Sequence, residues 1–243
     1  MSRFFVPKEM VKGNRIVITG KEAHHILDVM RLRQSDKVTT FDGSGREYTG
    51  IVKETGRRSL VVEIVETREP RQRESVKITL IQALPKKEKM DYIVEKATEL
   101  GVDRIVPVFT ERTIPDWDDK KKHSQVERWR KIALEAAKQC GRADIPEISG
   151  IEDFNSVITR MAGEKLRLIA VLSEETVPIA GAIAGPKPES IAIAIGPEGD
   201  FTEEETAAAK AAGFKPISLG PRVLRSDTAG LAAIAILNYE FEN

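Results

Sequence analysis

Ser190-Ile-Ala-Ile-Ala-Ile-Gly-Pro-Glu-Gly-Asp-Phe-Thr202 is the stretch that decides the fold of the C-terminal part of the chain. Residues 190–195 form an apolar run of strand length, and the Gly-Pro-Glu-Gly that follows has the composition of a tight turn. Thr202 and Glu205 have the Thr-x-x-Glu spacing of a capping box, which predicts that a helix starts directly after the turn. An apolar strand that leads through a turn into a helix is the unit of a parallel sheet covered by helices.

The same unit recurs on both sides of this stretch. Apolar runs predict further strands, and apolar residues at helical spacing predict the helices between them. Gly101 follows one of these helices as its expected C-terminal stop. The alternation predicts an α/β fold with a parallel sheet covered on both faces. The expected strands lie at 76–83, 104–109, 166–172, 190–195 and 215–219, and the expected helices at 86–100, 126–139, 202–212 and from 228 onward.

The N-terminal part of the chain has a different pattern. Short strands alternate with loops rich in glycine and polar residues, such as 42–45 and 55–58, which is typical of a small closed β-barrel. One helix is expected over 21–32, with Arg31 and Arg33 at its C-terminal end, where the helix dipole favours cations. The expected strands lie at 15–18, 37–41, 48–52 and 60–65.

A polar segment separates the two patterns. Residues 66–75 have a proline in the middle and otherwise only polar or charged side chains, so they add nothing to a core. We therefore predict an N-terminal domain over 1–70 and a C-terminal α/β domain over 74–243.

Composition narrows the possible classes of protein. The 243 residues are 41% hydrophobic and 31% charged, as in an ordinary globular protein. No apolar run approaches the roughly 18–20 residues of a membrane span, and residues 1–7 lack the length of a secretory signal. We therefore expect a cytoplasmic protein with no membrane partner. Lys plus Arg and Asp plus Glu balance at 38 each, so any binding of nucleic acid must come from local basic patches.

Several common kinds of site are excluded or weakened. Cys140 is the only cysteine, so an internal disulfide is impossible, and no Cys/His spacing fits a zinc site. We expect no bound metal. Cys140 itself is expected to be structural; a nucleophilic role is weakened because the three histidines lie far away in sequence. The chain has no Gly-x-Gly-x-x-Gly and no P-loop, so neither a dinucleotide-binding Rossmann domain nor a P-loop NTPase is supported.

Two segments follow predicted strands at the edge of the sheet where ligands of α/β proteins bind. In 195–202, glycines allow a ligand to approach the backbone, and the alternative is a tight turn without a ligand. Segment 218–230 leaves a strand through Gly220 and enters an alanine-rich helix. Arg225 lies just before this helix, where it either forms a surface salt bridge or orients an anion. Neither segment alone decides the function.

Longer motifs follow one another along nearly the whole chain. They are Gln82–Lys86 with Lys89–Asp91, Glu95–Val102, Glu111–Thr113, Glu127–Trp129, Glu135–Arg142, Ile195–Glu205 and Leu219–Arg225. Together they resemble the SPOUT methyltransferases, and within these the RsmE type, which methylates N3 of a uridine in 16S ribosomal RNA. Asp200 stands where the family commonly has glycine, and Ser226-Asp227 stand where it commonly has Thr-Glu, which leaves a carboxylate in place.

The resemblance implies a fold, an assembly and a cofactor. The C-terminal domain would be an α/β domain with a deep trefoil knot, and the N-terminal domain a PUA-like RNA-binding β-barrel. Family members are homodimers whose active sites form at the subunit interface. S-adenosylmethionine would lie in the knot against three loops. These loops map onto Leu172, Ser173, Glu174, Ile195, Gly196, Pro197, Glu198, Gly199, Leu219, Gly220, Val223, Leu224 and Arg225.

The resemblance also suggests a mechanism. Uracil N3 is a poor nucleophile until its proton leaves, so the enzyme must position the base and stabilise the developing anion. Arg225 is the candidate for stabilising a uracil oxygen, and Glu198 or Asp227 for receiving the proton. The implied partner is 16S rRNA in the small ribosomal subunit, by resemblance at uridine 1498. The expected RNA contacts, each with a solvated surface charge as the alternative, are Arg3, Arg31, Arg33, Arg57, Arg58, Lys86, Lys87 and Arg112.

Two other functions stay open. Another SPOUT activity would methylate a ribose 2′-oxygen or a tRNA base. The 2′-O group usually has Asn-Glu-Gly and Ser-Leu-Asn-Val segments, whereas this chain has Gly-Pro-Glu-Gly and Leu-Arg-Ser-Asp, which favours base methylation. A non-catalytic RNA-binding or ribosome-assembly factor would have no use for S-adenosylmethionine.

Overall fold

The computed structural model describes residues 3–70, 76–86 and 89–242. The chain divides into two compact units. The first contains Met1–Arg73 together with Ala137–Ile145, and the second contains Glu74–Ala136 together with Pro146–Asn243. Nothing in the sequence pattern assigns 137–145 to the first unit.

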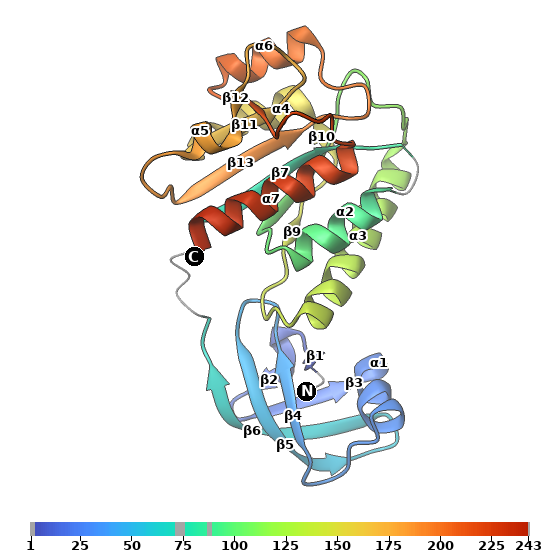
Figure 1. Cartoon of the computed structure of the whole chain (residues 1–243). Helices are drawn as coiled ribbons and strands as arrows, with labels where there is room; N and C mark the ends of the chain where they lie inside the picture. The colour runs from blue at the N-terminus through green and yellow to red at the C-terminus, as the bar shows by residue number, and fades with distance from the viewer. Residues whose placement is uncertain (1–2, 71–75, 87–88, 243) are drawn as a thin grey trace. The chain divides into compact units, whose positions relative to one another are not determined.

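Six strands form one sheet in the first unit (Figure 1). β1 pairs with β4 in parallel, and the other neighbours are antiparallel. Ile16 and Ile18 are buried while Val17 between them is exposed, which is the alternation of a sheet with one face on a core. Among the described residues the short edge strands β1 and β2 do not pair with each other, so the expected barrel is open there. In sheet order the strands are β1 (Arg3–Phe5), β4 (Lys37–Phe41), β5 (Glu47–Thr55), β6 (Ser59–Arg68), β3 (Arg15–Thr19) and β2 (Val11–Lys12).

A short helical segment packs on this sheet. Helix α1 (Gly20–His24) continues as a π-helical turn over His25–Val29. The segment ends before the expected residue 32, because the backbone of Arg31 adopts a φ of 57° in the left-handed region. Ala23 and Ile26 are fully buried in the core of the sheet. A single 3-10 turn, η1 (Lys8–Met10), lies between β1 and β2.

Residues 137–145 are an integral part of the first unit. They comprise the C-terminal end of helix α3 and the loop after it. The Lys138 Nζ atom forms an ion pair with Glu22 at 2.8 Å. The backbone N–H of Ile145 donates to the carbonyl of Gly43 at 3.1 Å. Charge pairing and backbone hydrogen bonds therefore both bind this stretch to the N-terminal strands.

The second unit is built on a parallel sheet, as the alternation of strands and helices predicts. Every residue of β13 after Ser190 is buried, and so is every residue of β7 after Lys77. Such continuous apolar strands require cover on both faces. In sheet order the strands are β10 (Glu152–Asp153), β8 (Arg104–Phe109), β7 (Lys77–Ala83), β13 (Ser190–Ile195), β11 (Leu166–Ala170), β14 (Lys215–Ser218) and β12 (Val177–Pro178), and β9 (Glu147–Ile148) pairs with β8.

Helices cover both faces of this sheet (Figure 1). Ile81 packs in one core cluster with residues of α4 and α6. The preceding residue of β7 is Leu80, and its side chain points to the opposite face of the sheet, where it lies beside Gly230 of α7. Helices α2 and α7 pack against each other, and α7 lies on β7 and β13. The helices are α2 (Lys89–Glu99), α3 (Asp119–Cys140), α4 (Phe154–Arg160), α5 (Ile179–Ile183), α6 (Glu203–Ala211) and α7 (Ser226–Glu242), with a 3-10 turn η3 (Met161–Gly163) after α4.

Helix α3 is longer than its apolar pattern indicates. It starts at Asp119 instead of the expected residue 126. The apolar pattern does not reveal the first two turns, because their side chains are polar and largely exposed. The Asp118 carboxylate accepts a hydrogen bond from the backbone N–H of Lys121 at 2.7 Å, as an N-terminal cap does. Hydrophobic periodicity marks only the part of a helix that packs on a core.

The chain crosses the sheet between β14 and α7. Two strands, β11 and β13, separate β14 from β7 in the sheet, yet α7 packs on β7 and β13. Residues 219–225 make this crossing past the carboxyl ends of the strands. The crossing is one that the expected trefoil knot requires, and the threading itself stays a prediction. In the described part of the chain, no helix combines the length and apolar composition needed to cross a membrane.

Candidate active site

A cavity of about 270 Å³ lies at the carboxyl ends of β11, β13 and β14. This is the edge of the sheet at which open α/β proteins bind their ligands. The segments that follow the three strands supply most of its wall, and the start of α7 closes it. Its lining residues are Ala170, Val171, Leu172, Ile195, Gly196, Pro197, Glu198, Asp200, Ile217, Ser218, Leu219, Gly220, Arg222, Val223, Leu224, Arg225, Ser226 and Ala229.

The cavity brings together most of the residues predicted to bind a cofactor. All three predicted loops contribute to one wall, although they are far apart in the sequence. Ser173, Glu174 and Gly199 do not line it and are exposed. The predicted residues that do line it are Leu172, Ile195, Gly196, Pro197, Glu198, Leu219, Gly220, Val223, Leu224 and Arg225.

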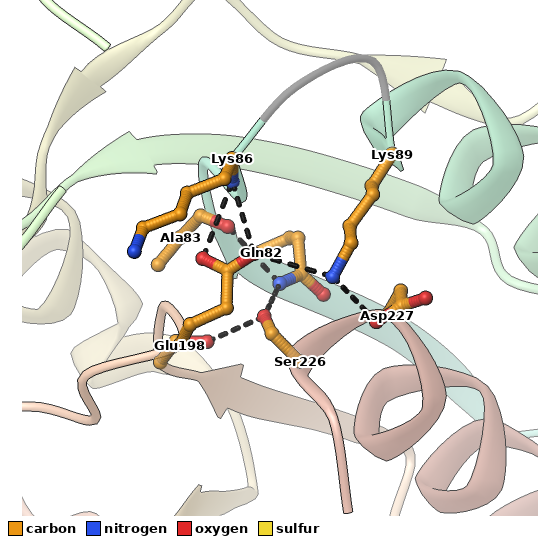
Figure 2. Close-up of polar contacts among 8 residues, drawn as sticks. Gln82, Ala83, Lys86, Lys89, Glu198, Ser226 and Asp227 are labelled. Atoms are coloured by element: carbon orange, nitrogen blue, oxygen red, sulfur yellow. Dashed lines mark hydrogen bonds and ion pairs between the residues drawn. The ribbon is translucent and has the colours of Figure 1, made fainter. Parts of the chain in front are cut away.

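A buried hydrogen-bond chain anchors the loop after β13 to β7 and to the start of α7. The Ser226 hydroxyl donates to the carbonyl of Gly196 at 2.6 Å, and it accepts a hydrogen bond from the Gln82 side-chain amide at 3.0 Å. The same amide also donates to the carbonyl of Ala83 at 3.0 Å. Figure 2 shows this chain running from β7 to the first residue of α7. Because Gln82 and Ser226 are buried, the loop cannot move without leaving polar groups unpaired.

The Glu198 carboxylate holds the same loop from the other side (Figure 2). Its two oxygens accept hydrogen bonds from the backbone N–H of Lys86 at 3.1 and 3.2 Å, and the Lys89 ammonium lies 3.3 Å from one of them. Lys89 also lies 3.3 Å from a carboxylate oxygen of Asp227. One cation therefore bridges the two carboxylates that were predicted to receive a proton.

These contacts set the charge state of the cluster. Burial raises the pKa of Glu198, but hydrogen bonds from its own backbone N–H, from that of Lys86 and from Lys89 outweigh it, so the pKa is lowered. Burial lowers the pKa of Lys89, but its hydrogen bonds to Glu198 and Asp227 outweigh it, so the pKa is raised. Glu198 is thus held ionised near neutral pH. A carboxylate with a lowered pKa is a weak general base.

Asp200 ties two of the cavity loops together. One carboxylate oxygen accepts a hydrogen bond from the backbone N–H of Leu172 at 2.8 Å, and the other accepts from the N–H of Phe201 at 2.9 Å. The backbone of Asp200 has a φ of 61°, in the left-handed region where glycine is normally preferred. A glycine would adopt this conformation without strain. The two hydrogen bonds offset the strain of a side chain at this position.

Arg112 also contacts the loop after β13. Its guanidinium donates to the carbonyl of Gly199 at 2.7 Å. This contact gives Arg112 a role in holding the loop. Its side chain stays exposed, and its contact with RNA stays a prediction. Lys86 is exposed and contributes its backbone N–H to the site. Lys87 lies outside the described residues.

Arg225 differs from these anchored residues. It lines the cavity and is exposed. Its backbone carbonyl accepts hydrogen bonds from the N–H groups of Thr228 and Ala229 at the start of α7. Its guanidinium forms no hydrogen bond or ion pair with another described residue, so the alternative of a surface salt bridge finds no partner there. Around it, Val223 is 74% exposed and Leu172 is 67% exposed.

The residues predicted to contact RNA from the first unit fall into two groups. Arg31, Arg33, Arg57 and Arg58 are exposed, and within the described ranges their guanidinium groups have no partner. Arg3 instead forms an ion pair with Glu47 and donates to the carbonyl of Gly141. The arginine of β1 is therefore committed to the fold of the first unit.

Metal and thiol chemistry find no support at the site. Across residues 3–70, 76–86 and 89–242, no group of three or more His, Cys, Asp or Glu side chains is arranged to hold a metal ion. Cys140 lies in the first unit, where its thiol contacts the carbonyl of Ala137 at 3.7 Å. It does not line the cavity.

The chain matches two models of protein families. The model of an RNA methyltransferase domain matches residues 72–238, and the model of an RNA methyltransferase PUA domain matches residues 18–65. The chain belongs to the RNA methyltransferase family. The cavity of this RNA methyltransferase lies entirely within residues 72–238, and the strands β4 and β5 of the first unit lie within the PUA match.

Full-length relatives give the same result. The methyltransferase is 31% identical to the ribosomal RNA small subunit methyltransferase E of Bacillus subtilis, over 100% of this chain and 98% of the relative. It is 33% identical to the protein of that name from Mycobacterium tuberculosis, over 95% and 88%. A crystal structure of the Neisseria gonorrhoeae ribosomal RNA small subunit methyltransferase E bound to S-adenosyl methionine is 32% identical, with a TM-score of 0.86 over 99% of this chain and 98% of the other. The α/β fold with an N-terminal PUA-like domain is thereby confirmed.

Sequence reasoning missed three residues that organise the site. Gln82 and Lys89 lie within the family motifs, but neither was predicted to be a site residue. Ser226 was noted only as a departure from the family. A signal for Gln82 exists in the sequence, because it is a polar residue at the end of an otherwise apolar strand. No comparable signal distinguishes Lys89 from other helix-surface lysines.

Proposed function

We propose that this methyltransferase transfers a methyl group from S-adenosylmethionine to N3 of a uridine in 16S ribosomal RNA of the small subunit. The observation that carries the proposal is the joint lining of one cavity by three strand-end segments, with Arg225 on its wall and a bridged pair of carboxylates beside it. The relatives aligned along the full chain bear the name ribosomal RNA small subunit methyltransferase E, and the Neisseria protein is bound to S-adenosyl methionine.

The residues present fit this cofactor. Apolar side chains from the ends of three strands suit an adenine ring, and loop backbone offers polar partners to ribose and amino-acid groups. A Cβ atom at Gly196 would come within 3.2 Å of Phe201 and of Asp200, so a side chain here would push these neighbours away from the turn. The exposed apolar side chains of Leu172 and Val223 would be covered by a bound ligand.

The chemistry requires positioning and charge stabilisation. When bound, S-adenosylmethionine supplies an electrophilic methyl group on a sulfonium. Arg225 would donate hydrogen bonds to a uracil carbonyl oxygen, which becomes more negative as the N3 proton leaves. Of the two candidate proton acceptors, Asp227 is better suited, because both oxygens of Glu198 already accept hydrogen bonds from the Lys86 backbone N–H. The target base must be accessible, either in an unpaired strand or pulled from its stack.

The remaining features of the proposal concern partners. Arg31, Arg33, Arg57 and Arg58 would contact RNA phosphates, since their guanidinium groups are exposed and lack described partners. The enzyme would act in the cytoplasm as a homodimer, on the assembled small subunit.

The test is transfer of tritium from labelled S-adenosylmethionine to small subunits that lack the modification and to free 16S RNA, followed by nucleoside analysis. We expect the label in 3-methyluridine, with more transfer to assembled subunits than to free RNA. Label in a 2′-O-methylated nucleoside, or transfer to tRNA alone, would replace the proposed substrate with another. Reproducible absence of transfer together with absence of cofactor binding would indicate a non-catalytic RNA-binding protein.

A further inference from the structure

Lys89 is the first residue of α2 that the structure describes. A lysine on a helix surface ordinarily keeps its charged head in water, but the side chain of Lys89 is only 29% exposed. Contacts outside the helix therefore account for its position.

Those contacts are two carboxylates on two different segments. Glu198 lies in the loop after β13 and lines the cavity, and Asp227 lies in the first turn of α7. The Lys89 ammonium is 3.3 Å from an oxygen of each (Figure 2). Without the cation, two negative charges would face each other across this gap. Like charges this close favour protonation of one partner or separation of the segments that carry them.

The two carboxylates are not equivalent. Glu198 has both oxygens engaged by the Lys86 backbone and by Lys89. Asp227 uses one oxygen, Oδ1, for Lys89. Its other oxygen, Oδ2, has no hydrogen bond to any residue that the structure describes. The bridge therefore anchors Glu198 and leaves Asp227 with one oxygen for a substrate.

We propose that Lys89 is a positioning residue for methyl transfer. By bridging Glu198 and Asp227, it fixes the loop after β13 to α7 and presents Asp227 Oδ2 to the uracil N3–H. This rests on the proposed function. In the step it serves, the N3–H bond breaks and its proton joins Asp227 Oδ2. The N3 electron pair forms a bond to the methyl carbon as the carbon–sulfur bond breaks, its electrons passing to sulfur. Asp227 then releases the proton to solvent.

The charged groups around this bridge are few. Among described residues, Lys89 interacts with Glu198 and Asp227, and the charged side chain that acts on Glu198 is Lys89. Removing the cation should raise the pKa of Glu198, because the adjacent positive charge of Lys89 favours its ionised form. A role confined to packing would leave this pKa unchanged.

The experiment compares Lys89→Met, Lys89→Arg and the matched control Lys96→Met. Lys96 lies on the same helix and pairs with Glu95 and Glu99, which the cavity does not include. In the protein without cofactor, ¹³C NMR follows the titration of the Glu198 carboxyl, assigned by comparison with Glu198→Gln. Single-turnover methyl transfer and the Kd of S-adenosylmethionine are measured on the same proteins.

For Lys89→Met we expect a higher titration midpoint for the Glu198 carboxyl and a single-turnover rate about 10- to 100-fold lower, as for a displaced catalytic group. Lys89→Arg should retain the midpoint and most of the rate, and Lys96→Met should match the wild type. An unchanged Glu198 midpoint in Lys89→Met would overturn the proposal, whatever happens to the rate, and so would an unchanged rate. If the wild type transfers no methyl group to any RNA while the Glu198 midpoint still shifts, the proposed function fails and the electrostatic bridge stands.

Discussion

Two segments that line the same cavity differ in how they are held. Four side chains anchor the loop 196–201 to the start of α7, to the segment after β7 and to the loops after β8 and β11. They belong to Ser226, Glu198, Asp200 and Arg112. The segment 219–225 has almost no such support: Ser218 contacts the backbone of Gly220 at its start, and most of its residues are exposed.

The number of anchoring contacts determines how each segment can contribute to ligand binding. A loop tied at several points keeps its backbone groups in place before a ligand arrives, which reduces the entropy lost on binding. A segment with free side chains can instead adjust when the ligand and the RNA are present. Under the proposed function, the anchored loop would preorganise the cofactor site, and the free segment would supply Arg225 as the group that responds to the substrate.

The largest expected effect on turnover is that of Arg225→Ala. Because its guanidinium has no described partner, we expect little change in the thermal midpoint and a change in the Kd of S-adenosylmethionine within about threefold. Turnover with RNA and cofactor saturating should fall by about 100- to 1000-fold, as for loss of a donor to a developing anion. Arg222→Ala, at an exposed neighbouring position of the cavity wall, is the matched control and should keep most of the turnover. Wild-type turnover in Arg225→Ala would remove Arg225 from the mechanism.

Ser226→Val should have the opposite profile. It removes the hydroxyl that joins Gln82 to the carbonyl of Gly196. The carbonyl loses this donor, and the Gln82 amide keeps only its hydrogen bond to the carbonyl of Ala83. The free energy of unfolding should fall by about 2–3 kcal/mol, and cofactor affinity should fall with it. Urea unfolding and calorimetric titration measure the two effects. Ser226→Thr retains a hydroxyl and is the control; if it is as impaired as Ser226→Val, the hydrogen-bond chain is not the cause.

Asp200 offers a smaller test of the anchored loop. Asp200→Ala loses two hydrogen bonds and keeps a Cβ in the left-handed conformation, so we expect a loss of about 1–2 kcal/mol in unfolding free energy. Asp200→Gly loses the same bonds but relieves the strain, and should be the more stable of the two variants. The order of their urea midpoints decides the matter. Equal midpoints would mean that the backbone conformation at this position carries no strain.

The smallest expected effect is the pH dependence contributed by Glu198. Its folded-state pKa lies below the reference value of 4.5, so its stabilisation is fully present above that value and is lost as the pH falls through the folded-state pKa. The difference in unfolding free energy between the wild type and Glu198→Gln should therefore shrink between pH 6 and pH 3. A difference that stays constant over this range would show that the carboxylate charge does not anchor the loop.

Much of the second unit is predictable from sequence, for a physical reason. Its strands are buried on both faces, so their apolar runs stand out; the bounds of β8 and β13 agree with the expected ranges at every residue. The capping box of Thr202 and Glu205 is likewise confirmed, with both reciprocal hydrogen bonds present. These features depend on local sequence, and local sequence is what a pattern records.

The features that escaped prediction depend on contacts between distant residues. Lys89 and Glu198 are more than one hundred positions apart, and so are Gln82 and Ser226. No spacing rule links such pairs, and a lysine at a helix end ordinarily indicates only a solvated surface. Two of the three cavity loops, at 195–199 and 219–225, could be placed at the sheet edge from the strand pattern. The third, at 172–174, was placed by the family resemblance. Their mutual anchoring depends on side-chain contacts between distant residues, which no strand pattern records.

Residues 137–145 belong to the first unit although more than sixty residues of the second unit precede them in the chain. Order of synthesis and order of completion therefore differ. At about 5–20 residues per second, translation needs roughly 4–14 seconds to pass from residue 73 to residue 145. During that interval the N-terminal strands have been made, but the ion-pair partner of Glu22 and the backbone partner of Gly43 do not yet exist. The first unit can therefore finish folding only after residues 137–145 have been translated, although its strands are made first.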